Sequence, residues 1–352
     1  MPRLRVSLVA LALLVVMTAA SPTSGGAQPA TPAATPAAKP QPPMQPTTGP
    51  GSNEALFGGV TAIKQAPPDA FFADYWLFVP TDPLPGTPRV EEPFPLVIFV
   101  HGSGAVDANL YLAWIEHLVR RGAVVIFPLY QQGPPGGEAG YSQTLQDDVG
   151  RALETLEQEG VPVDPTRVAV VGHSLGGALA VDYAASAAAA GLPVPTAVMG
   201  VAPGCSSEEV ACIGADLGTI APTTRVLLVT EREDPDPVGT AAVERIWAGL
   251  EGVPLENRDV VELVSDAHGN PPLLAVHIQA LAAQDGAQAL SGYAPDAYDW
   301  YGTWKWLDAL MDCAFAGEWC EVALGNTPEQ RFMGEWSDGV PVTEALVTDD
   351  PG

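Results

Sequence analysis

Six short apolar runs alternate with longer helical patterns over residues 70–316, and this alternation restricts the possible folds more than any other feature. The runs are Leu96 to Val100, Ala123 to Phe127, Val168 to Val171, Ala197 to Val201, Val226 to Thr230 and Val260 to Val264. Because each run is apolar at consecutive positions, it predicts a strand buried on both faces. The sequence therefore predicts an α/β fold with a mostly parallel central sheet covered by helices on both faces.

The segments between the runs have helical spacing, and one further strand is expected near the antiparallel edge of the sheet. The expected helices are Ala108 to Arg121, Ser142 to Glu159, Ser174 to Ala190, Thr240 to Leu250 and Pro272 to Ala283, and the further strand is Phe72 to Val79. In open α/β sheets the ligand lies outside the carboxyl ends of the strands. Reactive groups are therefore expected in the residues that directly follow each strand.

The third apolar run leads into Gly172-His173-Ser174-Leu175-Gly176-Gly177, which opens a stretch of small, helix-favouring residues. A serine on a tight turn between strand and helix has a strained backbone, and flanking glycines prevent clashes with the neighbouring elements. The helix that begins there directs its positive dipole end at a developing oxyanion. Ser174 is therefore the predicted nucleophile, although the pentapeptide without this context would also fit a glycine-rich turn.

The first apolar run ends in a polar, glycine-rich turn, His101-Gly102-Ser103-Gly104. Beside a nucleophile of this kind, such a turn provides one backbone N–H for the oxyanion, and the residue after the nucleophile provides the other. The predicted donors are the backbone N–H groups of Ser103 and Leu175. Gly104 is the alternative to Ser103.

The fifth apolar run leads into an acidic loop, Glu231-Arg232-Glu233-Asp234-Pro235-Asp236. The acid that orients a catalytic imidazole must lie on a loop just beyond a strand end, where it can reach the ring. Asp234 occupies that place and is the predicted acid. Asp236 is the rival.

Five histidines compete for the role of base. His173 lies inside the serine turn, His101 lies in the oxyanion turn, and His117 and His277 fall in helical patterns. His268 instead follows the last apolar run in a loop, downstream of the acid, and gives the chain order Ser, Asp, His. His268 is therefore the predicted base.

These parts resemble the α/β-hydrolase family over nearly all of residues 70–290. The turn at His101, the lead-in Val163 to Val168 and Gly-His-Ser-Leu-Gly-Gly are similar to those of secreted bacterial esterases related to dienelactone hydrolases and polyester hydrolases. With a Ser-His-Asp triad, the chain is expected to cleave carboxylic esters through an acyl-enzyme. The dienelactone branch uses a cysteine nucleophile, so its specific chemistry does not transfer. A peptidase of the same fold and a non-catalytic binding protein are the alternatives.

The N-terminus predicts export. Residues 1–27 contain Arg3 and Arg5, then the apolar run Val6 to Met17, then small residues, which is the order of a signal peptide. The run is too short for a membrane anchor, which needs about 20 apolar residues. Residues 28–52 are rich in Pro, Ala and Thr and predict an extended, solvated linker. Residues 53–352 are then the catalytic domain with a C-terminal extension, secreted and without a stable membrane anchor.

Net charge and cysteine content indicate which binding partners and which covalent links to expect. A net charge of −27 at pH 7 disfavours nucleic acid and anionic membranes. The cysteines form two close pairs, Cys205 with Cys212 and Cys313 with Cys320, which suit disulfides in an exported protein. A metal site is the weaker alternative because the spacing is wide and no histidine is near. We expect a monomer without metal or cofactor that acts on a small-molecule or polymeric ester.

Three further segments have less certain roles. The loops Gln131 to Tyr141 and Gly204 to Thr224 follow strand ends, and each is either a substrate loop or a plain surface connection. The aromatic residues Tyr298, Trp300, Tyr301, Trp304 and Trp306 have helical spacing, so most are expected to pack a C-terminal helix against the domain rather than to bind carbohydrate. No role is predicted for residues 326–352.

Overall fold

The computed structural model describes residues 39–65, 74–87, 93–131, 138–205, 213–234, 237–283 and 294–351. The predicted signal peptide, residues 1–27, lies outside the described residues. Cys212, the expected partner of Cys205, and Asp236, the rival acid, also lie outside the described residues.

The described residues form one nine-stranded sheet with the order β1-β2-β4-β3-β5-β6-β7-β8-β9. The strands are β1 (Phe57–Gln65), β2 (Tyr75–Pro83), β3 (Phe94–Val100), β4 (Val124–Pro128), β5 (Val163–His173), β6 (Ala197–Val201), β7 (Arg225–Glu231), β8 (Arg258–Leu263) and β9 (Leu346–Thr348). Every pair from β4 to β8 is parallel, whereas β1, β2 and β9 join antiparallel at the edges. All six predicted runs are strands of the parallel part, which confirms the predicted fold class.

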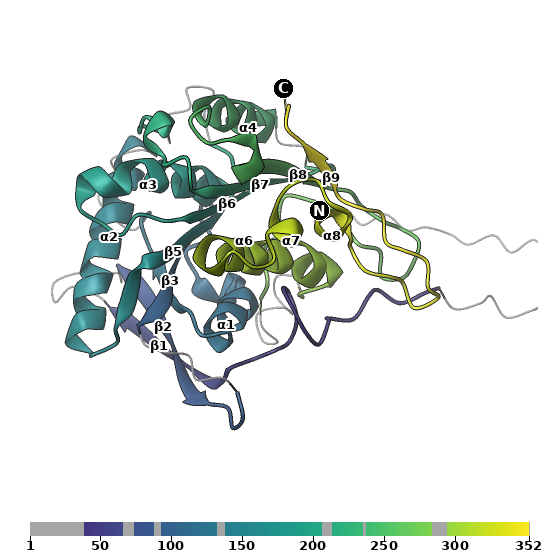
Figure 1. Cartoon of the computed structure of the whole chain (residues 1–352), viewed down its shortest axis with the longest axis horizontal. Helices are drawn as coiled ribbons and strands as arrows, with labels where there is room; N and C mark the ends of the chain where they lie inside the picture. The colour runs from purple at the N-terminus through teal and green to yellow at the C-terminus, as the bar shows by residue number, and fades with distance from the viewer. Residues whose placement is uncertain are drawn as a thin grey trace, which may run out of the picture. The chain divides into compact units, whose positions relative to one another are not determined.

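Helices cover both faces of the sheet (Figure 1). One face carries α1 (Leu112–Arg120) and α6 (Trp304–Ala316), and the other carries α2 (Glu138–Gln158), α3 (Leu175–Ala190) and α4 (Pro237–Gly249). Successive strand residues point to opposite faces, so Ile98 packs under α2 and α3 while Phe99 packs under α1 and α6. Both side chains are fully buried, which explains why the strands are apolar at consecutive positions.

The helix predicted from Pro272 to Ala283 is absent. The chain leaves β8, forms an antiparallel bridge between Asp266 and Leu273, and reaches only turns at residues 277–280. Leu273 and the alanines of residues 272–283 are fully buried, whereas Leu274 is 51% exposed. The backbone bonds to other segments; the N–H of Ala282, for example, donates to the carbonyl of Leu110. The apolar spacing that predicted a helix therefore reflects burial of an irregular segment.

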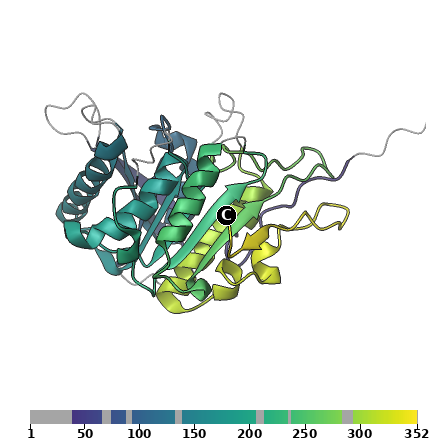
Figure 2. The same cartoon turned by 90° about the horizontal axis from the view of Figure 1, so that it is seen from above.

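Residues 28–38 of the expected linker lie outside the described residues, and its remaining part, residues 39–52, is not a solvated linker. The N–H of Gly51 donates to Asp308 of α6 over 2.8 Å, and the indole of Trp300 donates to the carbonyl of Pro43. Pro43 and residues 50–52 are buried. Figure 2 shows this segment in dark purple, running beside the long loop after β8 and the yellow C-terminal segment. Residues 39–46 have no regular secondary structure and residues 47–53 form bends and turns, and the segment belongs to the folded domain.

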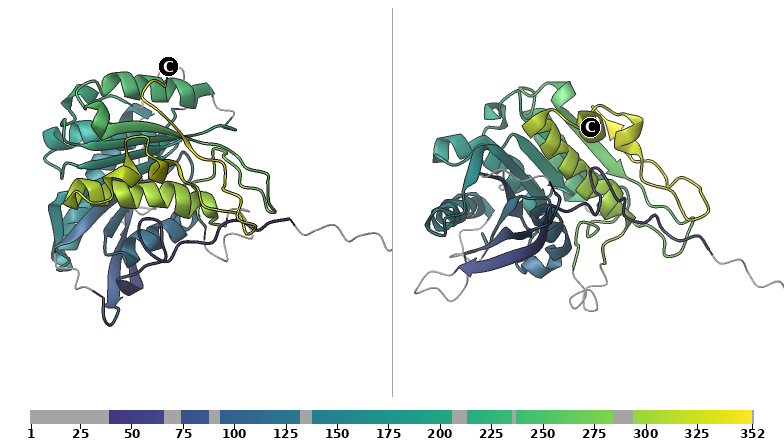
Figure 3. Two further views of the ribbon diagram at one scale, coloured as in Figure 1. Left: turned by 45° about the vertical axis from the view of Figure 1, so that its right-hand side comes forward. Right: turned by 60° about the horizontal axis from the view of Figure 1, so that its bottom comes forward.

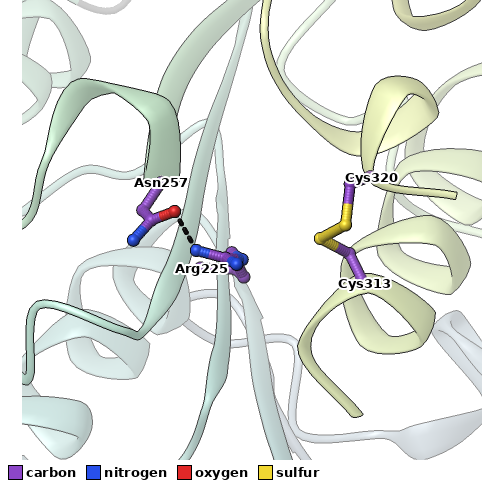
Figure 4. Close-up of a disulfide and its surroundings, with 4 residues drawn as sticks. All are labelled: Arg225, Asn257, Cys313 and Cys320. Atoms are coloured by element: carbon purple, nitrogen blue, oxygen red, sulfur yellow. Dashed lines mark hydrogen bonds between the residues drawn. A yellow bond between two sulfur atoms is a disulfide. The ribbon is translucent and has the colours of Figure 1, made fainter. Parts of the chain in front are cut away.

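The C-terminal extension packs on the sheet face that carries α6 (Figure 3). Tyr298, Trp304 and Trp306 are buried there, which confirms that this aromatic cluster is mainly core. Two short helices follow, α7 (Cys320–Ala323) and α8 (Pro328–Arg331). The disulfide Cys313–Cys320 joins α6 to the start of α7 as predicted (Figure 4).

Candidate active site

Ser174 lies on the sharp turn between β5 and α3. Its backbone has φ 57° and ψ −125°, a conformation that L-residues adopt only at a cost of about 1–3 kcal/mol. The turn requires glycine on both sides, because a Cβ on Gly172 would lie 2.0 Å from the carbonyl oxygen of Gly176 and one on Gly176 would lie 2.2 Å from that of Val100. The predicted strand, serine and helix arrangement is therefore present.

The histidine beside this serine is His277. Its Nε2 lies 2.9 Å from Ser174 Oγ, and its Nδ1 lies 2.7 Å from Asp234 Oδ2. The carboxylate accepts the Nδ1 hydrogen, so Nε2 is free to accept the serine proton. The imidazole is partly exposed, at 29%, and the carboxylate is 12% exposed. Three residues far apart in sequence thus form one hydrogen-bonded row.

The expectation that His268 fills this position is wrong. His268 lies in the excursion after β8, where its Nε2 contacts Asp338 Oδ2 at 2.9 Å on the surface. Its neighbour Asp266 accepts hydrogen bonds from the backbone N–H groups of His268 and Thr343. The irregular segment after β8 first runs away from Ser174 and places His268 at the surface. It then returns and places His277 beside Ser174. Both histidines satisfy the order Ser, Asp, His, so chain order alone could not distinguish them.

The loops that carry Asp234 and His277 are hydrogen-bonded to each other. The N–H of Glu233 donates to the carbonyl of Ala275, two residues before His277. Ser265 connects the same loops, because its hydroxyl donates to Glu233 Oε2 over 2.7 Å and accepts from the N–H of Ala275 over 2.8 Å. These contacts fix the loop of Asp234 against the segment of His277 where neither has regular secondary structure.

The turn His101-Gly102-Ser103-Gly104 lies against the serine. A Cβ on Gly102 would be 3.3 Å from Ser174 Cβ. The N–H of Gly104, the alternative donor, is engaged by Gln131 Oε1 at 2.7 Å. Within the described residues, the N–H groups of Ser103 and Leu175 have no hydrogen-bond acceptor. The geometry is therefore compatible with the predicted pair of donors and disfavours Gly104.

Residues 97–236 match the sequence model of a family described as alpha/beta hydrolase fold. The match spans the oxyanion turn, the serine turn and the loop of Asp234, and it agrees with the order of the sheet. The chain has the α/β-hydrolase fold. None of the curated proteins matches it. The match supports a hydrolase in general terms.

Among the described residues, no group of three or more His, Cys, Asp or Glu side chains could hold a metal ion. Among the same residues, no helix is long and apolar enough to cross a membrane.

A second carboxyl group is buried beside Asp234. Glu231 ends β7 with 5% exposure, and within the described residues neither carboxyl oxygen has a hydrogen-bond partner. Burial, and secondarily the charge of Asp234, raise the pKa of Glu231 well above its ordinary value. The sequence shows Glu231 only as a member of the acidic loop. Its burial could not be predicted, because burial at a strand end depends on which distant segments pack over it.

Glu231→Gln should raise the melting temperature more at pH 8 than at pH 4. A raised folded pKa means that the unfolded chain loses its proton first, so stability falls as the pH rises from the unfolded pKa of about 4.3. Glutamine does not titrate and avoids this loss. Thermal denaturation of both proteins at the two pH values measures it, and an equal shift at both would contradict the assignment.

Proposed function

We propose that this chain is a serine hydrolase that cleaves carboxylic esters through an acyl-enzyme. The observation that carries the proposal is the hydrogen-bonded row from Asp234 through His277 to Ser174. Its distances lie within the range at which a general base takes a proton from a nucleophile. The resemblance of the serine turn to secreted bacterial esterases supports esters as the substrate class.

Each residue of the row has a separate task. His277 Nε2 takes the proton of Ser174 Oγ as the oxygen attacks the ester carbonyl, and it later returns a proton to the leaving alcohol. Asp234 holds Nδ1–H, which fixes the tautomer and stabilises the imidazolium. Water then attacks the acyl-enzyme with His277 again as base, which releases the acid.

The N–H groups of Ser103 and Leu175 bind the oxyanion in this proposal. Both have no acceptor among the described residues, and Leu175 is the first residue of α3, where N–H groups have no partner within the helix. The helix dipole adds favourable charge at the same point. Because the donors are backbone groups, side-chain changes at position 103 should act mainly through the shape of the turn.

We further propose that the protein is exported. The basic, apolar and small segments of residues 1–27 support this, and so does the disulfide Cys313–Cys320, a bond that persists in oxidising compartments.

The test is covalent labelling combined with a substrate panel. A fluorophosphonate probe should label the purified protein on Ser174, identified by peptide mass spectrometry. The protein should hydrolyse p-nitrophenyl esters and leave the matched p-nitroanilide uncleaved. Turnover of the anilide would favour a peptidase instead, since a serine peptidase cleaves both activated esters and anilides. Absence of labelling would contradict the proposal.

A further inference from the structure

A buried chain of hydrogen bonds through His173 and Tyr111 connects two loops of the candidate active site to the end of β5. His173 Nε2 lies 2.7 Å from the carbonyl oxygen of His277, and its Nδ1 lies 2.9 Å from the hydroxyl of Tyr111. That hydroxyl lies 3.0 Å from the N–H of Gly102. Both side chains are almost fully buried.

Only one direction of hydrogen bonding satisfies all the groups. A carbonyl can only accept, so His173 Nε2 carries a hydrogen and donates it to His277. Burial, and secondarily the charge of His277, lower the pKa of His173 to about 4, so the ring is neutral at pH 7 and Nδ1 carries no hydrogen. Nδ1 therefore accepts from Tyr111, whose oxygen accepts from the N–H of Gly102.

The two ends of this hydrogen-bond chain lie in two parts of the site that lack regular secondary structure. Gly102 precedes Ser103, the proposed oxyanion donor, in the turn after β3. His277 lies in the irregular segment after β8, where its carbonyl accepts from the ring of His173. Between them, His173 is the last residue of β5 and directly precedes Ser174. A rigid strand end is thus hydrogen-bonded to both loops that must meet at the serine.

We propose that His173 and Tyr111 are positioning residues that hold His277 and the oxyanion turn in register with Ser174. The inference rests on the proposed hydrolase function. Neither side chain has to touch the substrate. Their effect is on geometry, because a misplacement of about 1 Å can cost about 100-fold in rate.

Three variants test the two ends of the hydrogen-bond chain separately. Tyr111→Phe removes the hydroxyl that satisfies Gly102 and His173 Nδ1. At position 173, a glutamine amide extends as far as Nε2 and can still donate to His277, whereas an asparagine amide extends only as far as Nδ1 and cannot. His173→Gln should therefore retain more activity than His173→Asn. Tyr183→Phe is the matched control, since it removes another buried hydroxyl, which donates to the carbonyl of Pro193.

The readouts are kcat, KM and the rate of fluorophosphonate labelling, measured below each variant's melting temperature. Tyr111→Phe and His173→Asn should each lower kcat and the labelling rate about tenfold, as changes in supporting shells commonly do, with little change in KM. Tyr183→Phe should change only stability. Equal kcat and labelling in the wild type and the folded variants would overturn the inference and leave the proposed function intact. Absence of labelling in the wild type would overturn both.

Discussion

His277→Ala should lower kcat/KM for a p-nitrophenyl ester by about four orders of magnitude or more. The imidazole lies 2.9 Å from Ser174 Oγ and 2.7 Å from Asp234, and loss of the base in serine hydrolases has effects of this size. The side chain is partly exposed, so the variant should fold. Steady-state kinetics and thermal denaturation of the same preparation measure the two quantities.

His268→Ala is the matched control. It removes an imidazole only nine positions earlier in the same segment, one that contacts Asp338 at the surface and not the serine. Exposed ion pairs contribute little to stability, so both activity and melting temperature should stay near those of the wild type. The reverse result, with His268 essential and His277 dispensable, would contradict the row of residues described above.

Ser174→Ala and Ser174→Gly should both abolish fluorophosphonate labelling and lower ester turnover by about four orders of magnitude or more, because each removes the attacking oxygen. They should differ in stability. Ser174 has φ 57°, where a Cβ is strained and glycine is not, so the glycine variant should be about 1 kcal/mol more stable than the alanine variant.

Chemical denaturation of the two serine variants measures that difference directly. Neither replacement has a hydroxyl, so any difference in their stability reports the backbone and not the chemistry. Equal stability would show that the turn is not strained in solution. Ester hydrolysis that survives in both variants would instead remove Ser174 from the mechanism.

The serine turn and the fold could be predicted because their signals are local. A strand buried on both faces is apolar at every position, and the backbone of the serine turn demands glycine at 172 and 176, where any Cβ would meet a carbonyl oxygen. These requirements act over a few neighbouring residues. They leave a pattern in the sequence that does not depend on the rest of the chain.

The histidine beside Ser174 could not be predicted because its position depends on distant segments. The excursion that carries His268 away is held by Asp266, which accepts hydrogen bonds from Thr343, and by the N–H of Asn270, which donates to the carbonyl of Pro40. A Cβ on Gly269 would lie 2.1 Å from the ring of Trp336. The residues that neighbour His268 and His277 in the sequence give no sign of these contacts. The apolar residues around His277 also have the spacing of a helix, although they form none.

The packing of residues 39–52 against the domain could not be predicted for a related reason. Its composition is that of a solvated linker, but a few backbone groups find specific partners, such as the N–H of Gly51 with the buried carboxylate of Asp308. That carboxylate also accepts from His117 and pairs with Arg121. Residue composition does not record single contacts of this kind.

The contacts of residues 39–52 determine where the gene can be shortened. Composition alone would suggest a boundary at residue 53. That boundary deletes the carbonyl of Pro40, which accepts from the N–H of Asn270, and the backbone of Gln41, which is hydrogen-bonded to Ser337. Those partners support the excursion between β8 and His277. Trimming should therefore stop at Lys39, since residues more than 200 positions before the imidazole help to set the path that leads to it.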